Sequence, residues 1–303
     1  MPTNQKTPLQ RAADAFLLDK EVMGCTKATL TWYRDYIERL VTWLTGKGIT
    51  AAAGITLDLL REYIAAVQSR GLAPKTVHHY ATATKIFCKW LAAEKLIDAD
   101  PADRLPRPKV PKKVLPALSQ ADANKLLDAC ECERDKALLL FMLDTGVRCG
   151  ETVAVNLGDV DTRTGAVTIV QGKGQKGRMV YLGAQSRRAL TRYLLTRADA
   201  GATDAPLWTS QTSGGRLTKW GVTLILRRMG ERAGVKVYPH MLRRTFAIWS
   251  LRAGMDVARL AALLGHSDLA TVRKYLPIAD SDLADAHAQH GAVDATLTAK
   301  KGR

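Results

Sequence analysis

Basic, imidazole and phenolic side chains recur in four short segments of the second half of the chain, and together they suit phosphate chemistry. Guanidinium and ammonium groups neutralise charge on a phosphoryl group, histidine moves protons, and a deprotonated tyrosine is a nucleophile. The segments are TGVRCGE with Arg148 and Glu151, GKGQKGR with Lys173, Lys176 and Arg178, HMLRRTFA with His240 and Arg243, and LLGHSDLATVRKY with His266 and Tyr275.

Taken singly, each segment also has an ordinary structural explanation. An arginine three residues before a glutamate is commonly a surface ion pair, and a glycine-rich stretch between strands is commonly a solvated turn. An HxxR pair is more often structural than catalytic, and a tyrosine at a helix end usually packs against the core. The glycine-rich segment does not fit the GxxxxGK[ST] pattern, which disfavours binding of a nucleoside triphosphate.

The elements around these segments can be predicted from the pattern of apolar residues. Residues 134–145 contain the apolar run 137–143 and predict a buried helix directly before Arg148. Two β-type runs, 167–170 and 179–182, flank the GKGQKGR tip and predict a small antiparallel hairpin within residues 160–182. Further helices are predicted from Ser119 through Cys130, and from Leu217 onward with ends at Gly234, Gly254 and Gly265.

The first hundred residues predict an all-helical domain of four or five helices. Apolar residues recur at helical spacing over 32–44, 59–67 and 77–91. The last of these helices would begin near Pro74 and carry Lys75, Lys85 and Lys89 on one side. Such a face could follow a DNA backbone or could simply be solvated.

Residues 101–116, PADRLPRPKVPKKVLP, mark the sharpest change in composition. Proline withholds the hydrogen bonds of helix and sheet and keeps a chain extended, so this stretch is predicted to be an interdomain linker. Its basic residues, Arg107, Lys109, Lys112 and Lys113 among them, suit contact with phosphates. The predicted order is a helical DNA-binding domain at 1–100, this linker, a catalytic domain at 117–290, and a polar tail at 291–303.

The whole chain is basic, with 45 Lys and Arg against 29 Asp and Glu in 303 residues. Both 1–115 and 116–303 carry a positive excess, which fits two parts that face a polyanion better than one basic tail, although a high pI alone favours nucleic acid only weakly.

Short apolar runs and a polar start predict a soluble, cytoplasmic protein. Five scattered cysteines predict reduced thiols and no zinc site.

In their order and separation, the four segments resemble those of the tyrosine site-specific recombinases, the phage integrase family. The resemblance covers nearly the whole chain and is closest to Xer-type and small mobile-element members. It implies a mainly α fold with a small antiparallel β-sheet (α+β), in which an all-helical, SAM-like core-binding domain precedes a mixed helical catalytic domain. Three positions depart from the usual pattern without removing a catalytic group: Thr152, Tyr181 and Arg244.

The resemblance also implies a mechanism that needs no cofactor and no metal. Tyr275 would attack the scissile phosphate and form a 3′-phosphotyrosyl bond, while Arg148 and Arg243 hold the non-bridging oxygens. The remaining roles would be proton removal from Tyr275 by His240, protonation of the leaving 5′-oxygen by Lys173, a hydrogen bond from His266 to the phosphate, and orientation of Arg148 by Glu151. Contacts to the DNA backbone are expected from Lys75, Lys85, Lys89, Arg107, Lys109, Lys112, Lys113, Lys176 and Arg178.

The implied partner is double-stranded DNA with inverted-repeat core sites. Strand exchange between two such sites implies a homo-tetramer, or a hetero-tetramer with a related recombinase, that integrates or excises a mobile element or resolves DNA dimers. Two other functions stay open: DNA relaxation of the type IB topoisomerase kind, and DNA binding without catalysis. The compact layout and the GKG hairpin disfavour the first, and the presence of every catalytic residue disfavours the second.

Overall fold

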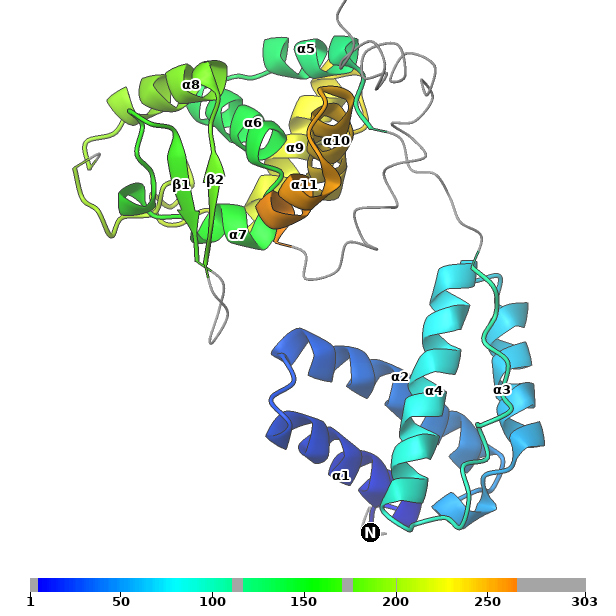
Figure 1. Cartoon of the computed structure of the whole chain (residues 1–303). Helices are drawn as coiled ribbons and strands as arrows, with labels where there is room; N and C mark the ends of the chain where they lie inside the picture. Colours follow the sequence, from blue (N-terminus) through cyan, green and yellow to red (C-terminus); the bar gives the residue numbers. More distant parts are fainter. Residues whose placement is uncertain (1–4, 111–116, 171–176, 200, 266–303) are drawn as a thin grey trace, which may run out of the picture. The chain divides into compact units, whose positions relative to one another are not determined.

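The computed structural model describes residues 5–110, 117–170, 177–199 and 201–265. The chain divides into two units, residues 1–113 and 114–303, and each has its own hydrophobic core (Figure 1). Helices make up most of both units, with one two-stranded sheet in the second. The predicted fold class, mainly α with a small antiparallel sheet, is confirmed.

The first unit is all-helical, as predicted. Its core gathers around Phe16, whose ring makes edge-on contacts with Tyr33, Phe87 and Trp90 at centroid distances of 5.2, 5.4 and 5.5 Å. The helices are α1 (Pro8–Val22), α2 (Lys27–Gly46), α3 (Leu57–Ser69) and α4 (Pro74–Ala93), with a short 3-10 turn at Ala52–Gly54. The three apolar patterns correspond to α2, α3 and α4, whereas the position of α1 was not predicted.

The helix starts in this unit follow from local sequence. Thr7, Thr26 and Thr56 each accept a hydrogen bond from a backbone N–H in the first turn of the helix that follows. Such caps satisfy donors that have no partner inside the helix. Pro74 occupies the first turn of α4, where its missing N–H costs nothing and its fixed φ suits the helix.

The first part of the predicted linker belongs to this unit. Ala102 and Leu105 are buried in its core, and Lys85 Nζ on α4 donates to the carbonyls of Ala102, Asp103 and Leu105 at 2.6, 2.7 and 3.1 Å. Farther along, the ring nitrogen Nδ1 of His78 lies 3.0 Å from the carbonyl oxygen of Pro108. Residues 102–108 therefore lie along α4, and the first part of the predicted linker packs against the first unit.

In the second unit, the predicted buried helix is α6 (Glu133–Thr145). The hairpin pairs β1 (Ala166–Ile169) with β2 (Arg178–Tyr181) in antiparallel register, one residue earlier on each strand than predicted. The other helices are α5 (Gln120–Asp128), α7 (Cys149–Ala154), α8 (Ala184–Leu195), α9 (Lys219–Ala233), α10 (Pro239–Arg252) and α11 (Val257–Leu264), with a 3-10 turn at Leu157–Asp159. Of these, α8 was not predicted.

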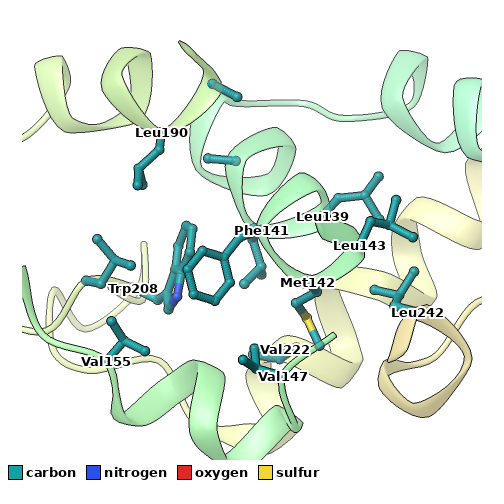
Figure 2. Close-up of a cluster of buried hydrophobic side chains, with 14 of the residues drawn as sticks. Leu139, Phe141, Met142, Leu143, Val147, Val155, Leu190, Trp208, Val222 and Leu242 are labelled. Carbon is teal, nitrogen blue, oxygen red and sulfur yellow. The ribbon is translucent and has the colours of Figure 1, made fainter. Parts of the chain in front are cut away.

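Helix α6 forms the centre of the second core. Figure 2 shows Phe141 turned toward Trp208, with Leu139 and Leu143 on the side that faces Leu242 of α10. The rings of Phe141 and Trp208 are 5.3 Å apart and edge-on, and Tyr193 of α8 stacks on Trp208 at 5.6 Å. Because α6 is packed on several sides, the chain that leaves its end starts from a fixed point.

The part of the chain that the structure describes lacks three features. No helix there is long and apolar enough to cross a membrane. All five cysteines lie in it and none forms a disulfide. Within the same residues, no three His, Cys, Asp or Glu side chains come together as a potential metal site.

Candidate active site

A turn at the end of α6 directs the chain into the first of the four predicted segments, the one that carries Arg148. Gly146 ends α6 in the left-handed conformation, at φ 60°, and a Cβ at this position would come within 2.2 Å of the Phe246 ring of α10. Only glycine meets both conditions without strain. The tight turn brings Arg148 to the N-terminus of α7.

Arg148 and Glu151 form a reciprocal pair at the start of α7. The backbone N–H of Arg148 donates to Glu151 Oε2 at 2.8 Å, and its Nη1 donates to Oε1 at 2.9 Å. The Arg148 side chain remains 45% exposed, against 12% for Glu151. These contacts are those expected of a carboxylate that orients an arginine, and they leave an open side of the guanidinium for a phosphate.

Thr152, one of the departures from the family pattern, supports the same turn. Its side chain is buried and its Oγ1 donates to the backbone carbonyl of Arg148 at 3.1 Å. A buried hydroxyl must find an acceptor, and here it finds one in the preceding helical turn. The hydroxyl therefore fits this position without disturbing the pair of Arg148 and Glu151.

Arg178 does not lie on an open surface, contrary to its expected role as a DNA-backbone contact. Its Nη1 and Nη2 donate to Glu151 Oε1 and Oε2 at 3.0 and 2.7 Å, and its Nε donates to the backbone carbonyl of Leu263 at 2.7 Å. The side chain is only 10% exposed. The first residue of β2 is thus joined to α7 and to the last turn of α11, inside the unit.

The pKa of Glu151 reflects this double pairing. Burial by itself acts to raise the pKa, but the hydrogen bonds from Arg178 and Arg148 and the charge of Arg178 outweigh it and lower the pKa from 4.5 to about 2. Glu151 is therefore ionised at every pH at which a DNA-binding protein works. The two arginines and this one carboxylate keep a net positive charge between them.

Arg243 of α10 is buried next to the same turn. Its Nη1 donates to the carbonyl of Gly146 at 2.7 Å and its Nη2 to the carbonyl of Leu264 at 2.8 Å, and the residue is 2% exposed. His240, one turn earlier on α10, is exposed. The structure thus brings Arg243 to the turn that carries Arg148, as the predicted site requires.

The end of α11 belongs to the same cluster. Arg178 and Arg243 bind the carbonyls of Leu263 and Leu264, and Gly265 ends the helix at φ 64°. Figure 1 shows α7, the start of β2 and the end of α11 on one side of the unit. His266, the next predicted site residue, lies outside the described residues, as do Lys112, Lys113, Lys173, Lys176 and Tyr275.

The cations predicted to contact the DNA backbone divide into two kinds in the first unit. Lys75, Lys89, Arg107 and Lys109 are exposed and keep that role as an expectation. Lys85 differs, because its ammonium already donates to three carbonyls. It stabilises the segment along α4 and is poorly placed to bind phosphate.

Lys219, at the start of α9, is a further cation near Arg148 that the sequence analysis did not single out. Its side chain passes so close to Gly150 that a Cβ there would lie 2.9 Å from Lys219 Cε, and the residue is exposed. The only sequence signal was a lysine directly after the helix cap Thr218. That pattern is too common to indicate a site.

Comparison with known protein families gives two matches. The pattern of the phage integrase family matches residues 116–281, and that of the phage integrase N-terminal SAM-like domain matches residues 20–95. The two matches fall in the second and the first unit, respectively. The segments that carry Arg148, Arg243 and Tyr275 all lie within the first match.

Curated relatives are similar along most of their length. The tyrosine recombinase XerD of Ralstonia nicotianae is 32% identical over 299 residues, which are 96% of each chain. The tyrosine recombinase XerC of Xanthomonas campestris pv. campestris is 31% identical over 271 residues, 87% of this chain and 83% of the relative.

Solved structures share the fold. The crystal structure of XerA recombinase is 26% identical, covers 92% of this chain and 98% of its own, and superposes with a TM-score of 0.52. A Tn1549 transposon integrase in complex with a circular intermediate DNA is 17% identical, covers 94% and 99%, and has a TM-score of 0.75. From the family match and the near full-length relatives, the chain belongs to the phage integrase family, the tyrosine recombinases.

Proposed function

We propose that this protein is a site-specific recombinase that cuts and rejoins duplex DNA through a 3′-phosphotyrosyl intermediate on Tyr275. The observation that carries the proposal is the arrangement around Arg148. Its guanidinium is oriented by Glu151 and open on one side, and Arg243 is fixed next to the same turn. Two arginines held in advance of the reaction suit the charge that develops on a phosphoryl group in the transition state.

The proposed chemistry is a transesterification. The oxygen of Tyr275 attacks the scissile phosphorus, the bond to the 5′-oxygen breaks, and Lys173 supplies the proton that this leaving oxygen takes up. His240 receives the tyrosine proton, which is necessary because the unperturbed pKa of a phenol is about 10. Arg148, Arg243 and His266 contact the non-bridging oxygens. The 5′-hydroxyl of a partner strand then attacks the phosphotyrosine, which restores the tyrosine and needs no ATP.

The proposed partner is duplex DNA with inverted-repeat core sites, bound by both units. In the first unit, Lys75, Lys89, Arg107 and Lys109 would contact its phosphate backbone. Exchange between two duplexes needs four active sites, so we propose a tetramer on two DNA sites, formed by this chain alone or with a related recombinase. We further propose that the protein acts in the cytoplasm. The proposed biological role is integration or excision of a mobile element, or resolution of DNA dimers.

Covalent trapping tests this function. Purified protein is incubated with a pool of nicked duplexes of randomised sequence and with the DNA that flanks its gene, and adducts stable to SDS are isolated and sequenced. Loss of the short fragment beyond the nick prevents religation, so the intermediate accumulates. We expect adducts with a shared inverted-repeat sequence, and none with Tyr275→Phe, which keeps the ring but lacks the nucleophile.

The outcomes separate the competing functions. If neither DNA source yields an adduct, the proposal is overturned and DNA binding without catalysis is the remaining function. Adducts without a shared sequence, together with relaxation of any supercoiled plasmid, would identify a topoisomerase-like enzyme. Exchange between two duplexes that both carry the recovered sequence would establish recombination.

A further inference from the structure

We propose that Arg178 is a positioning residue for this reaction: through Glu151 it fixes Arg148, and through Leu263 it fixes the end of α11. This inference rests on the proposed function and deepens it. It also replaces the expectation that Arg178 contacts the DNA backbone. Arg178 would act on the reaction through these neighbours, without touching the DNA.

The division of donors around Glu151 is the first support. Oε1 accepts from Nη1 of Arg148 and Nη1 of Arg178, while Oε2 accepts from the backbone N–H of Arg148 and Nη2 of Arg178. Each carboxylate oxygen therefore has one donor from each arginine. Removal of Arg178 would take one donor from both oxygens and leave a largely buried carboxylate with a single arginine to hold its orientation.

Exposure distinguishes the two arginines. The Arg148 side chain is 45% exposed, whereas that of Arg178 is 10% exposed and all three of its guanidinium nitrogens donate to protein oxygens. Arg148 therefore presents an edge of its guanidinium to solvent, whereas the guanidinium of Arg178 is turned inward.

The contact with α11 is the second support. The last carbonyls of a helix have no partners inside it, and Arg178 Nε binds one of them, that of Leu263. The guanidinium also packs against Gly265, where a Cβ would lie 2.9 Å from Nη1. The residue that precedes His266 is therefore held by the same side chain that holds Glu151.

Position in the chain adds the third support. Arg178 is the first residue of β2, directly after the GKGQKG stretch that contains Lys173. The Arg178 side chain thus connects three segments: the start of β2, helix α7, which begins directly after Arg148, and the end of α11, which directly precedes His266. A residue placed in this way can set the relative positions of three groups that must meet at one phosphate, where an error of 1 Å can cost about 100-fold in rate.

The test compares cleavage with DNA binding in the full-length protein. The DNA is a nicked duplex that carries the sequence recovered by covalent trapping. For Arg178→Gln we expect the single-turnover rate of adduct formation, at protein concentrations that saturate the DNA, to fall about 100-fold. The dissociation constant and its salt dependence should stay as in the wild type. A backbone contact would instead weaken binding and make the slope of log K against log salt shallower by about 0.9, and that result would overturn the inference.

A matched variant controls for lost stability. The Arg197 side chain is 6% exposed. Like Arg178, it donates to a carboxylate, that of Asp199, and to backbone carbonyls, those of Pro206 and Leu207. Arg197→Gln should lower the thermal midpoint without slowing cleavage by the folded protein. If it slows cleavage as much as Arg178→Gln does, the effect is general destabilisation and the inference fails.

Two further variants test the route through Glu151. Arg178→Lys keeps the charge, but one ammonium cannot serve both carboxylate oxygens and Leu263, so it should remain at least about 10-fold slow; full activity would overturn the geometric role. Glu151→Gln alone should be slow, and adding Arg178→Gln should cost at most about 3-fold more, because interactions that act as a unit are not additive. Multiplicative losses would show that Arg178 acts independently of Glu151.

Failure of this inference is distinguishable from failure of the proposed function. If the wild type forms no adduct, the function is wrong. If the wild type forms the adduct and Arg178→Gln forms it equally fast, the function stands and only the role of Arg178 is overturned.

Discussion

Glu151 shows how a single buried carboxylate can organise cations for phosphate chemistry. It is 12% exposed and forms ion pairs with Arg148 and Arg178 at 2.9 and 2.7 Å. A buried charge is tolerable only when it is paired and hydrogen-bonded, and these contacts provide both. Because two arginines share one carboxylate, the cluster stays positive and can still attract a phosphate.

This pairing predicts a pH dependence of stability. The pKa of Glu151 is lowered from 4.5 to about 2 in the folded protein, so the ionised form contributes stability that is fully present above about pH 4.5. That contribution, on the order of 3 kcal/mol, is lost as the pH falls from about 4.5 to 2. The free energy of unfolding of the wild type, minus that of Glu151→Gln, should be constant from pH 7 to 5 and shrink steadily below pH 4.5. A difference that does not change down to pH 2.5 would contradict the pairing.

At the scale of elements, the end of α6 determines the position of Arg148. Helix α6 is packed on several sides, and the turn at Gly146 leads from it to α7 in very few residues. Arg243 of α10 donates to the carbonyl of Gly146, and the Phe246 ring of α10 lies against its Cα. The position of Arg148 is therefore fixed by how α10 packs against α6.

Gly146→Ala tests this packing, with Gly234→Ala as its control. Both glycines end a helix at similar φ, 60° and 64°. A Cβ at Gly146 would meet Phe246 at 2.2 Å, whereas a Cβ at Gly234 would project into open space. Gly234→Ala should lose about 1–2 kcal/mol of unfolding free energy from left-handed strain, and Gly146→Ala about 1–3 kcal/mol more from overpacking. Equal losses in chemical denaturation would show that α10 does not constrain the turn.

At the scale of the whole molecule, positive charge has two separate uses. Some cations hold the protein together: Lys85 fixes residues 102–105 to α4, and Arg178 joins three segments of the second unit. Others, such as Lys75 and Arg107, are exposed and suit a phosphate backbone. The net charge of +16 therefore overstates the number of cations available to DNA.

Lys75→Met and Lys85→Met should separate these uses on the same helix. Lys75→Met should make the slope of log K against log salt for DNA binding shallower by about 0.9 and change the free energy of unfolding by less than about 0.5 kcal/mol. Lys85→Met should leave that slope unchanged and lower the free energy of unfolding by about 1–3 kcal/mol, because three carbonyls lose a charged donor. The reverse pattern would restore the sequence-based expectation for Lys85.

The sequence alone determined the fold class, most of the helices, the hairpin and the family, because apolar periodicity, caps and motif spacing are local properties. It also identified Arg148, Glu151 and Arg243 as candidate site residues. It did not predict α8, or that residues 102–108 lie along α4, or that Lys85 and Arg178 donate hydrogen bonds to protein oxygens. In the sequence, a basic side chain in a linker-facing helix or a glycine-rich hairpin looks the same whether it faces solvent or protein. Only the tertiary structure supplied the partners, Glu151 and Leu263 for Arg178 and three carbonyls for Lys85, because these contacts join residues that packing alone brings together.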